Sequence, residues 1–438
     1  MEKMIVPIQR NFYLNGTYAF LLFLMAALLH QSGEIFEINL SLSDIFCLLV
    51  ILLLFLHKQL LVPIAPGTFF LFLSGWVLLI ALYYIPDRFF YVPNPKDIII
   101  DYMKLTAIFF YFLLGYNLER LGWTYNWLKI YAFFGLLIGF AGILLTILNI
   151  SLFREFFFYD SIRYKGLMID PNYFAVLQMT ALAYFLRKEE LKTLSKWIFS
   201  LIIFLAILVS GSKTGLITLF LYFNFFVIER LIFRPMKPFL ISVLFLLGGF
   251  VAIIFPLLYT LLETLAKEWG GLFPTIERVR VLFTDFSSAV TESGSERDGI
   301  WQVALEIIKQ SPFFGVGIGT YSGLSLQLFH EPHVAHNTFL QLLAEWGIPI
   351  SILFFSFVMY LVIKATISSD SGDETKILRD MMIVLLIGSM AVSLNNARIL
   401  WLILGALMAK LSGKILNASG GSYNFESSGI FKAKKTDV

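Results

Sequence analysis

The chain has 438 residues, of which 58% are hydrophobic and 14% are charged, whereas soluble domains carry about 25% charged residues. A water-soluble globule of this composition could not cover its surface with polar side chains, so we expect an integral membrane protein. The net charge of +3, without a basic stretch interleaved with aromatic residues, excludes nucleic acid as an expected partner. Because Cys47 is the only cysteine, an intrachain disulfide and thiolate metal sites are excluded.

Twelve hydrophobic segments have, or nearly have, the roughly 17–25 apolar residues that a transmembrane helix needs. Their continuous apolar runs lack the alternation of barrel strands. The predicted fold class is therefore an all-α polytopic membrane protein with about twelve transmembrane helices and a large outward-facing loop. The segments cover residues 13–30, 41–56, 67–85, 98–118, 125–150, 171–186, 196–211, 214–233, 239–265, 347–367, 378–395 and 398–413.

The distribution of Lys and Arg predicts the topology, because cytoplasmic segments carry more of these residues than outer ones. With the N-terminus inside, the cytoplasmic segments hold 19 Lys and Arg, and the short outer segments hold 7. Both termini are therefore predicted to be cytoplasmic. The predicted regions are transmembrane helices 1–9 in residues 1–265, an extracytoplasmic loop in 266–346, helices 10–12 in 347–413 and a disordered cytoplasmic tail in 414–438.

The long outer loop is predicted to contain two short helices. Ser295 and Asp298 have the spacing of a capping box, and the first helix continues from them to about Gln310. The second runs from about Asn337 to Trp346, and its apolar side chains predict that it rests on the edge of the bilayer. One face of the first helix is apolar and carries Ile300, Ala304, Ile307 and Ile308.

Four outward cations are candidate ligands for an anion. Lys213 lies in a turn between two apolar segments, where it either binds an anion or extends to the lipid headgroups. Arg297 opens a helix whose N-terminal dipole disfavours a cation, so it is either a phosphate ligand or an ordinary solvated arginine. Arg163 and Lys165 either add to the anion site or anchor the chain to anionic headgroups.

His336 directly precedes the second loop helix. A helix N-terminus disfavours imidazolium, so His336 is expected to be neutral and able to accept a proton as a general base. The alternative is a helix-capping or interfacial histidine. His330, His333 and His336 have the spacing HxxHxxH, but Pro332 argues against one continuous helix, and no metal site is predicted.

Two further motifs have structural interpretations. Gly315-Val-Gly-Ile-Gly319 is compatible with nucleotide binding, but no strand–helix unit surrounds it, which favours a tight bend. Asp170 is predicted to cap the sixth hydrophobic helix, with Pro171 at its first position. The remaining set, outward cations plus one histidine beside a bilayer, predicts a substrate with a membrane-embedded tail and a phosphate or diphosphate head.

The motifs that carry these residues resemble the O-antigen polymerase/O-antigen ligase superfamily. The resemblance implies a metal-independent, inverting glycosyltransferase of the GT-C type that needs no cofactor. It also implies a donor oligosaccharide on undecaprenyl diphosphate, at the outer face of the bacterial cytoplasmic (inner) membrane. The matching segments are residues 163–175 (RYKGLMIDPNYFA), 210–215 (SGSKTG), 294–301 (GSERDGIW), 312–317 (PFFGVG) and 336–347 (HNTFLQLLAEWG).

The resemblance also assigns roles to residues of this chain. Arg297 and His336 match the family's functional pair, and Lys213 matches a position where the family commonly has Arg. Lys213 and Arg297 would bind the diphosphate, with help from Arg163 and Lys165, while His336 would act as the general base. A flippase and a chain-length regulator of the same pathway would be its partners.

Polymerase and ligase share this donor and differ in the acceptor. The favoured prediction is a polymerase that joins lipid-linked repeat units into a surface polysaccharide such as O-antigen, capsule or exopolysaccharide. The richness in Phe, Ile and Lys favours it, because low-GC genomes include many bacteria that lack lipopolysaccharide. The alternative is an O-antigen ligase that transfers the glycan to lipid A–core. A flippase or other transporter predicts internal repeats that the sequence lacks, and a non-catalytic member of an export complex is the remaining alternative.

Overall fold

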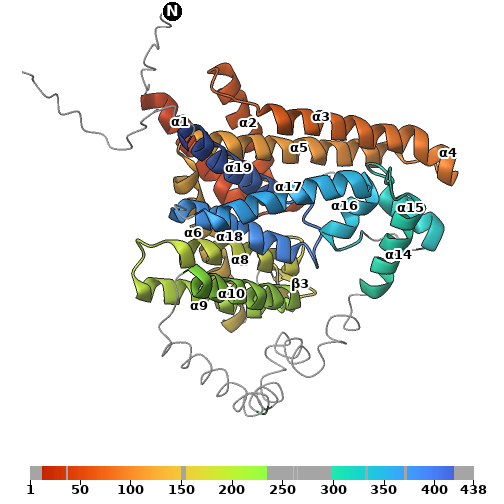
Figure 1. Ribbon diagram of the computed structural model, residues 1–438. Helices are drawn as coiled ribbons and strands as arrows, with labels where there is room; N and C mark the ends of the chain where they lie inside the picture. The colour runs from red at the N-terminus through yellow and green to blue at the C-terminus, as the bar shows by residue number, and fades with distance from the viewer. Residues whose placement is uncertain are drawn as a thin grey trace, which may run out of the picture.

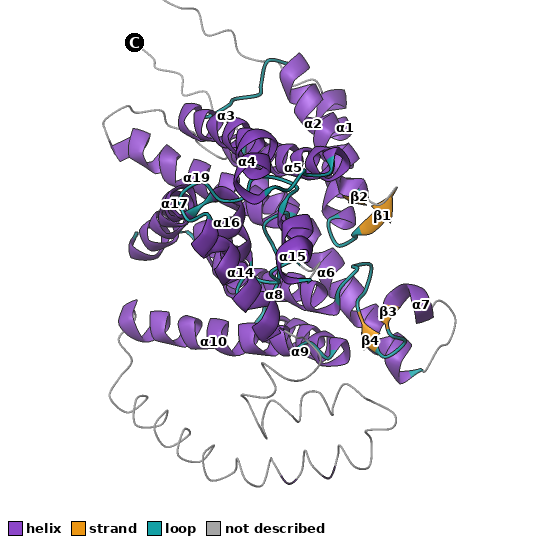
Figure 2. Ribbon diagram, turned by 90° about the vertical axis from the view of Figure 1, so that its right-hand side faces the viewer, coloured by secondary structure: helices purple, strands orange, loops and turns teal. Residues whose placement is uncertain are grey.

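The computed structural model describes residues 12–35, 38–148, 154–233, 260, 264, 297–330, 334–368 and 372–418. Within these residues the regular structure is mainly helical, and long helices pack side by side (Figure 1). Two pairs of short strands depart from the predicted all-α class, and Figure 2 shows them at the edge of the helices. The strands β1 (Gly33–Ile35) and β2 (Ile38–Leu40) pair antiparallel, as do β3 (Phe158–Tyr159) and β4 (Arg163–Tyr164).

The helices of the N-terminal half follow the predicted hydrophobic segments. The carboxylate of Asp170 accepts the backbone N–H groups of Asn172 and Tyr173, and Pro171 is the first helical residue, which confirms the predicted cap. The elements are α1 (Phe12–Leu28), α2 (Leu42–Leu56), α3 (Ile64–Leu79), η1 (Ile80–Tyr84), α4 (Ile85–Phe89), α5 (Pro95–Arg120), α6 (Thr124–Ile147), α7 (Arg154–Phe157), α8 (Pro171–Arg187), α9 (Thr193–Ser210) and α10 (Lys213–Phe233).

The C-terminal half contains the loop helices and the last hydrophobic segments. Two loop helices are confirmed, α14 (Arg297–Gln310) and α16 (Thr338–Trp346), and the apolar face predicted for α14 is buried. Between them lies α15 (Tyr321–Phe329), which the sequence did not predict. The remaining helices are α17 (Ile348–Ile367), α18 (Asp373–Gly388) and α19 (Arg398–Ala418).

Two boundaries differ from prediction. The segment predicted at 378–395 is helical only to Gly388, because residues 389–397 form turns whose carbonyls accept hydrogen bonds from α16. At the other end of α19, the helix continues to Ala418 and so extends five residues into the predicted tail (414–418). The rest of that tail lies outside the described residues.

Eleven of the twelve predicted hydrophobic segments are helices, and the ninth, 239–265, lies outside the description apart from residues 260 and 264. Among the described residues, five helices are long and apolar enough to cross a membrane. The protein is therefore a helical membrane protein, and the full set of twelve crossings stays a prediction. The five are Ile64–Phe89, Pro95–Arg120, Thr124–Ile147, Thr193–Ser210 and Ile348–Ile367.

Helix α8 is the central helix of one half of the molecule. Its side chains from Phe174 to Phe185 are all buried, and α6, α9, α10 and α18 pack around it. A helix that is apolar on every side must be enclosed by other helices, and α8 meets this condition. We call the end of this group that carries the N-termini of α8 and α10 and the C-terminus of α18 the loop end, and the opposite end the far end.

Helices α5 and α19 approach each other closely because of two glycines. A methyl group at Gly115 would lie 1.9 Å from the carbonyl oxygen of Leu402, and one at Gly405 would lie 2.0 Å from that of Phe112. Only glycine permits such backbone contact, and small residues serve this purpose between membrane helices. The pair places the start of α19 and its preceding turn firmly against α5.

Candidate active site at the loop end

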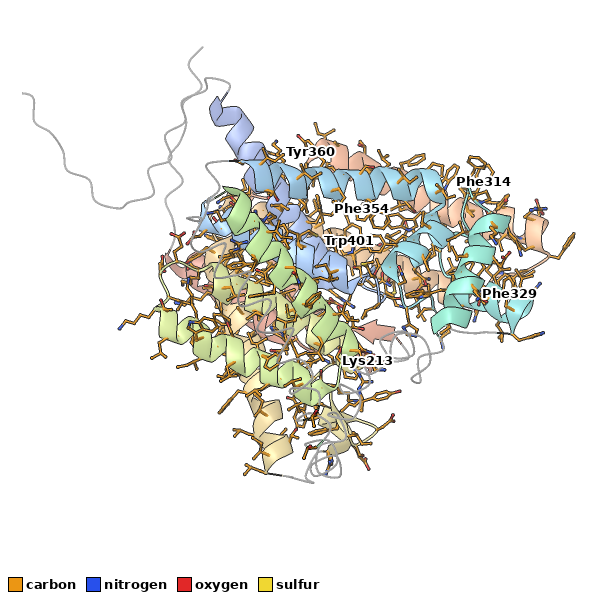
Figure 3. The ribbon with its side chains drawn as sticks, turned by 60° about the horizontal axis from the view of Figure 1, so that its bottom comes forward. Lys213, Phe314, Phe329, Phe354, Tyr360 and Trp401 are labelled. Carbon is orange, nitrogen blue, oxygen red and sulfur yellow. The ribbon has the colours of Figure 1, made fainter. Side chains whose placement is uncertain are left out.

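The turn between α9 and α10 holds Lys213 at the start of a helix. Gly211 ends α9 with φ +58°, a left-handed conformation that suits glycine. The hydroxyl of Ser212 accepts the backbone N–H of Gly215 at 3.0 Å, which caps α10. Lys213 is the first residue of α10 and is half-buried, and Figure 3 shows it at the end of that helix.

Arg163 contacts this same turn, although 50 positions of sequence separate it from Lys213. Its Nε donates to the carbonyl oxygen of Ser210 at 3.1 Å, and its Nη2 donates to Oδ1 of Asn172 at 3.2 Å. The hydroxyl of Ser212 donates to the same Asn172 oxygen at 2.9 Å. The structure thus brings the predicted residues Arg163 and Lys213 together, with the start of α8 between them. Lys165 is half-buried and follows β4.

His336 lies immediately before α16, as predicted, and its side chain is exposed. Asn337, rather than His336, caps the helix, because its Oδ1 accepts the N–H groups of Phe339 at 2.9 Å and Leu340 at 3.2 Å. His336 itself has φ +47°, in the left-handed region that residues with a side chain rarely adopt. The imidazole therefore projects from a tight turn at the positive end of a helix dipole.

The start of α16 is fixed to the turn that follows α18. The N–H of Thr338 donates to the Ser389 carbonyl at 2.8 Å, and its hydroxyl donates to the Val392 carbonyl at 2.9 Å. The same hydroxyl accepts the N–H of Leu394 at 2.7 Å. These bonds fix Thr338, which lies two positions after His336, to the loop end of α18.

Helix α8 connects the two turns. A methyl group at Gly215, near the start of α10, would lie 2.6 Å from Cβ of Ala175, and one at Gly388 would lie 2.7 Å from Val176. The Lys213 turn and the end of α18 therefore pack against consecutive residues of α8. Since the His336 turn is fixed to the end of α18, the motifs that carry Arg163, Lys213 and His336 all lie at the loop end.

Arg297 is the first residue of α14, and its side chain lies outside the described residues, as does Ser295 of the predicted capping box. The buried face of α14 packs against α15 and α16 in a second hydrophobic core. This packing brings the helix that begins at Arg297 against the helix that follows His336. The functional role of Arg297 stays a prediction.

The glycine run from Gly315 to Gly319 passes between helices. All three glycines have positive φ, and a methyl group at Gly317 would lie 2.6 Å from the carbonyl oxygen of Val77. The N–H of Val316 donates to the Ala344 carbonyl at 2.8 Å. The run is therefore a close-packed strap between α3 and α16, in agreement with the structural interpretation of this motif.

The three histidines of the HxxHxxH spacing do not lie on one helix in the part of the chain that is described. His330 ends α15 with φ +61° and is exposed, and His333 lies outside the described residues. Among the described residues, no group of three His, Cys, Asp or Glu side chains could hold a metal ion.

Glu345 is a site residue that the sequence reasoning missed. It lines a small pocket of about 30 Å³ together with six apolar residues and three other polar ones, Asp101, Asn395 and Asn396, after which we call it the polar pocket. Burial, with a contribution from the nearby Asp101 carboxylate, raises the pKa of Glu345 to about 8. An acidic residue within a short apolar helix was the available signal, because acidic side chains are almost never enclosed in a protein unless they are paired.

An apolar cavity lies next to this polar pocket. Its volume is about 290 Å³, and apolar residues of α3, α5, α17 and α19 line it. Phe354 and Trp401 stack on its wall with ring centroids 5.2 Å apart (Figure 3). The cavity and the polar pocket share Leu105 and Ile108, so the two spaces adjoin. Within the described residues, the protein thus offers an apolar space that leads to polar side chains beside α16.

Comparison with known proteins agrees with the motifs. Residues 198–355 match the family model described as O-Antigen ligase, and the match includes the Lys213 turn, Arg297 and α16. A search of curated proteins finds no similar sequence. Residues 198–355 are therefore similar to the O-antigen ligase family, which confirms the resemblance to the O-antigen polymerase and ligase superfamily.

Proposed function

We propose that the protein is an inverting membrane glycosyltransferase that polymerises oligosaccharide repeat units carried on undecaprenyl diphosphate. The observation that carries the proposal is that three motifs lie at the same end of the helix group, the loop end. Arg163 is hydrogen-bonded to the Lys213 turn, and α8 links that turn to the one that presents His336. Two cations and one exposed imidazole at the same end of the helices suit a substrate with a diphosphate leaving group and a hydroxyl nucleophile.

The donor is bound through its diphosphate. Lys213 is a compact point charge at the N-terminus of α10, where the helix dipole adds to its attraction for an anion. Arg163 is hydrogen-bonded to the turn that carries Lys213 and so helps to position the lysine that binds the phosphate. Arg297 supplies a guanidinium from the start of α14, and Lys165 adds positive charge near Arg163. These cations neutralise the charge that develops on the leaving diphosphate.

Catalysis then needs one proton transfer. A hydroxyl of the acceptor attacks the anomeric carbon of the donor glycan from the face opposite the diphosphate. The bond between the anomeric carbon and the diphosphate oxygen breaks, and undecaprenyl diphosphate leaves with the electron pair. His336 takes the proton of the attacking hydroxyl, for which a neutral imidazole at a helix N-terminus is suited. The configuration of the anomeric carbon is inverted.

The apolar cavity supports a lipid-linked substrate. Three of the four helices that line it, α3, α5 and α17, are long and apolar enough to cross a membrane, and its lining residues are all apolar. An apolar lining of this kind matches a hydrocarbon tail, which has no polar group that needs a hydrogen-bond partner. The distribution of Lys and Arg and the family resemblance support an active site at the extracytoplasmic face of the inner membrane, with both termini in the cytoplasm.

A second candidate is an O-antigen ligase, which the description of the matched family favours. The polymerase and the ligase differ in the acceptor that they use.

Purified protein in liposomes is given one lipid-diphosphate-linked repeat unit, with and without lipid A–core, and the products are resolved by size. Long glycans without lipid A–core indicate a polymerase, and transfer only with lipid A–core indicates a ligase. Movement of the donor between leaflets without glycosidic bond formation would overturn both.

A further inference from the structure

The turn that presents His336 needs support from its surroundings. A left-handed φ costs free energy for a residue with a Cβ atom, so the conformation persists only where neighbouring groups impose it. Ala335, the preceding residue, is fully buried, while the His336 side chain is exposed. The backbone of the turn is thus anchored in the protein at one residue and projects the imidazole outward at the next.

Gln341 supplies one anchor. Its Oε1 accepts the backbone N–H of Ala335 at 2.9 Å, and its Nε2 donates to Oε1 of Glu345 at 2.5 Å. Gln341 is buried, and it lies four residues before Glu345 on the same helix, a spacing that places two side chains on one face. Because the Ala335 N–H requires an oxygen, the amide group of Gln341 must direct its NH₂ toward Glu345.

Glu345 fixes the other end of this bridge. The charged and titratable groups that face it are Asp101 and Lys104 of α5, which form an ion pair at 2.8 Å, and Tyr321 of α15. Burial and the Asp101 carboxylate raise the pKa of Glu345 to about 8, so its carboxyl is mainly protonated at neutral pH. A protonated carboxyl still has a carbonyl oxygen that accepts from Gln341.

We propose that Gln341 and Glu345 are positioning residues of the active site, which hold the His336 turn in its left-handed conformation through the N–H of Ala335. This inference rests on the proposed function for His336. It assigns a role to the half-buried Glu345, whose carboxyl orients the amide that holds the turn. Neither residue contacts the substrate in this scheme, so both act through the placement of the imidazole.

Exchange of the two side chains gives the sharpest test. In Gln341→Met, the Ala335 N–H loses its acceptor, and kcat for glycan transfer is expected to fall about 10- to 100-fold with the KM for the donor unchanged.

In Gln341→Glu, two neighbouring carboxyls must share a proton, so kcat is expected to fall as pH rises. In the double variant Gln341→Glu with Glu345→Gln, the new amide donates to the new carboxylate, whose other oxygen accepts from Ala335. The double variant is expected to recover kcat and to lose the added pH dependence.

A readout without turnover separates this proposal from the proposed function. With ¹⁵N-labelled histidine, the His336 ring signal is assigned through His336→Asn and titrated in each protein. The Gln341→Met variant is expected to shift the His336 titration, and the double variant is expected to restore it. If the wild-type protein forms no glycosidic bond, the proposed function fails, while the titrations still test the bridge. An unchanged His336 titration in Gln341→Met, or a double variant no better than the single variants, would overturn the inference.

Discussion

Two groups of buried carboxyls in this protein have opposite surroundings. At the far end, Asp380 accepts from Arg187 and Arg379 and from the hydroxyl of Tyr222, and Glu229 pairs with both arginines. These side chains come from α8, α10 and α18. In α16, Glu345 instead contacts the amide of Gln341 and faces the Asp101 carboxylate.

The difference separates what stabilises the helices from what serves the site. Where two guanidinium groups meet two carboxylates, the buried charges cancel, and the cluster joins three helices. Where a carboxyl meets an amide and another carboxyl, the charged form is disfavoured and the group keeps its proton near neutral pH. The far end is therefore expected to respond to mutation through folding, and the loop end through activity.

The largest expected effect belongs to His336. Replacing it with alanine removes the general base, which contributes about 10²–10⁴-fold to rate. Glycan transfer by His336→Ala should fall by that factor, while its unfolding midpoint in detergent stays within a few degrees of wild type. His330→Asn is the matched control, because His330 is an exposed histidine of the same loop with a left-handed φ that asparagine tolerates. Wild-type turnover in His336→Ala would exclude the base role.

The far-end cluster should show the largest loss of stability. Asp380→Asn leaves the buried guanidinium groups of Arg187 and Arg379 without one carboxylate, a change that costs about 3–5 kcal/mol in buried ion pairs. Thermal unfolding of the purified protein measures it. The control is Lys309→Ala, which breaks an exposed pair with Glu306 and should cost less than about 1 kcal/mol. Equal unfolding midpoints for the two variants would contradict the division between the ends.

Lys213 should have an intermediate effect on activity. Loss of a charge-assisted contact is worth about 1.5–3 kcal/mol, so Lys213→Ala should lower kcat/KM for the donor about 10- to 100-fold. Lys213→Arg keeps the charge and should retain most of the activity, since arginine also binds phosphate. Initial rates over a series of donor concentrations measure both. A Lys213→Ala variant with unchanged kcat/KM would leave the lysine only the role of contacting headgroups.

The smallest expected effect is a pH dependence of stability that comes from Glu345. Its pKa rises from 4.5 in the unfolded chain to about 8 in the folded protein, so the proton binds more tightly to the folded state. The stability it contributes is complete below the unfolded pKa and is lost as pH rises through about 8. The wild-type unfolding midpoint should therefore fall between about pH 5 and 8 relative to that of Glu345→Gln. Parallel profiles for the two proteins would show that the carboxyl is not buried in this way.

The sequence by itself determined the helices and the residues worth testing. Long apolar runs have no stable alternative to a helix in a membrane. The cap at Asp170, the buried face of α14 and the start of α16 follow from local patterns within a few residues. The cations and His336 were visible because charged and titratable residues are scarce in this chain.

Only the tertiary structure decided which of these residues meet and how they are held. The hydrogen bond from Arg163 to Ser210, the bridge from Glu345 through Gln341 to Ala335, and the end of α18 at Gly388 depend on neighbours that come together only in the fold. A pattern read along the chain reports local preferences. The contacts that place a side chain at the loop end arise from the packing of distant helices, which those preferences do not specify.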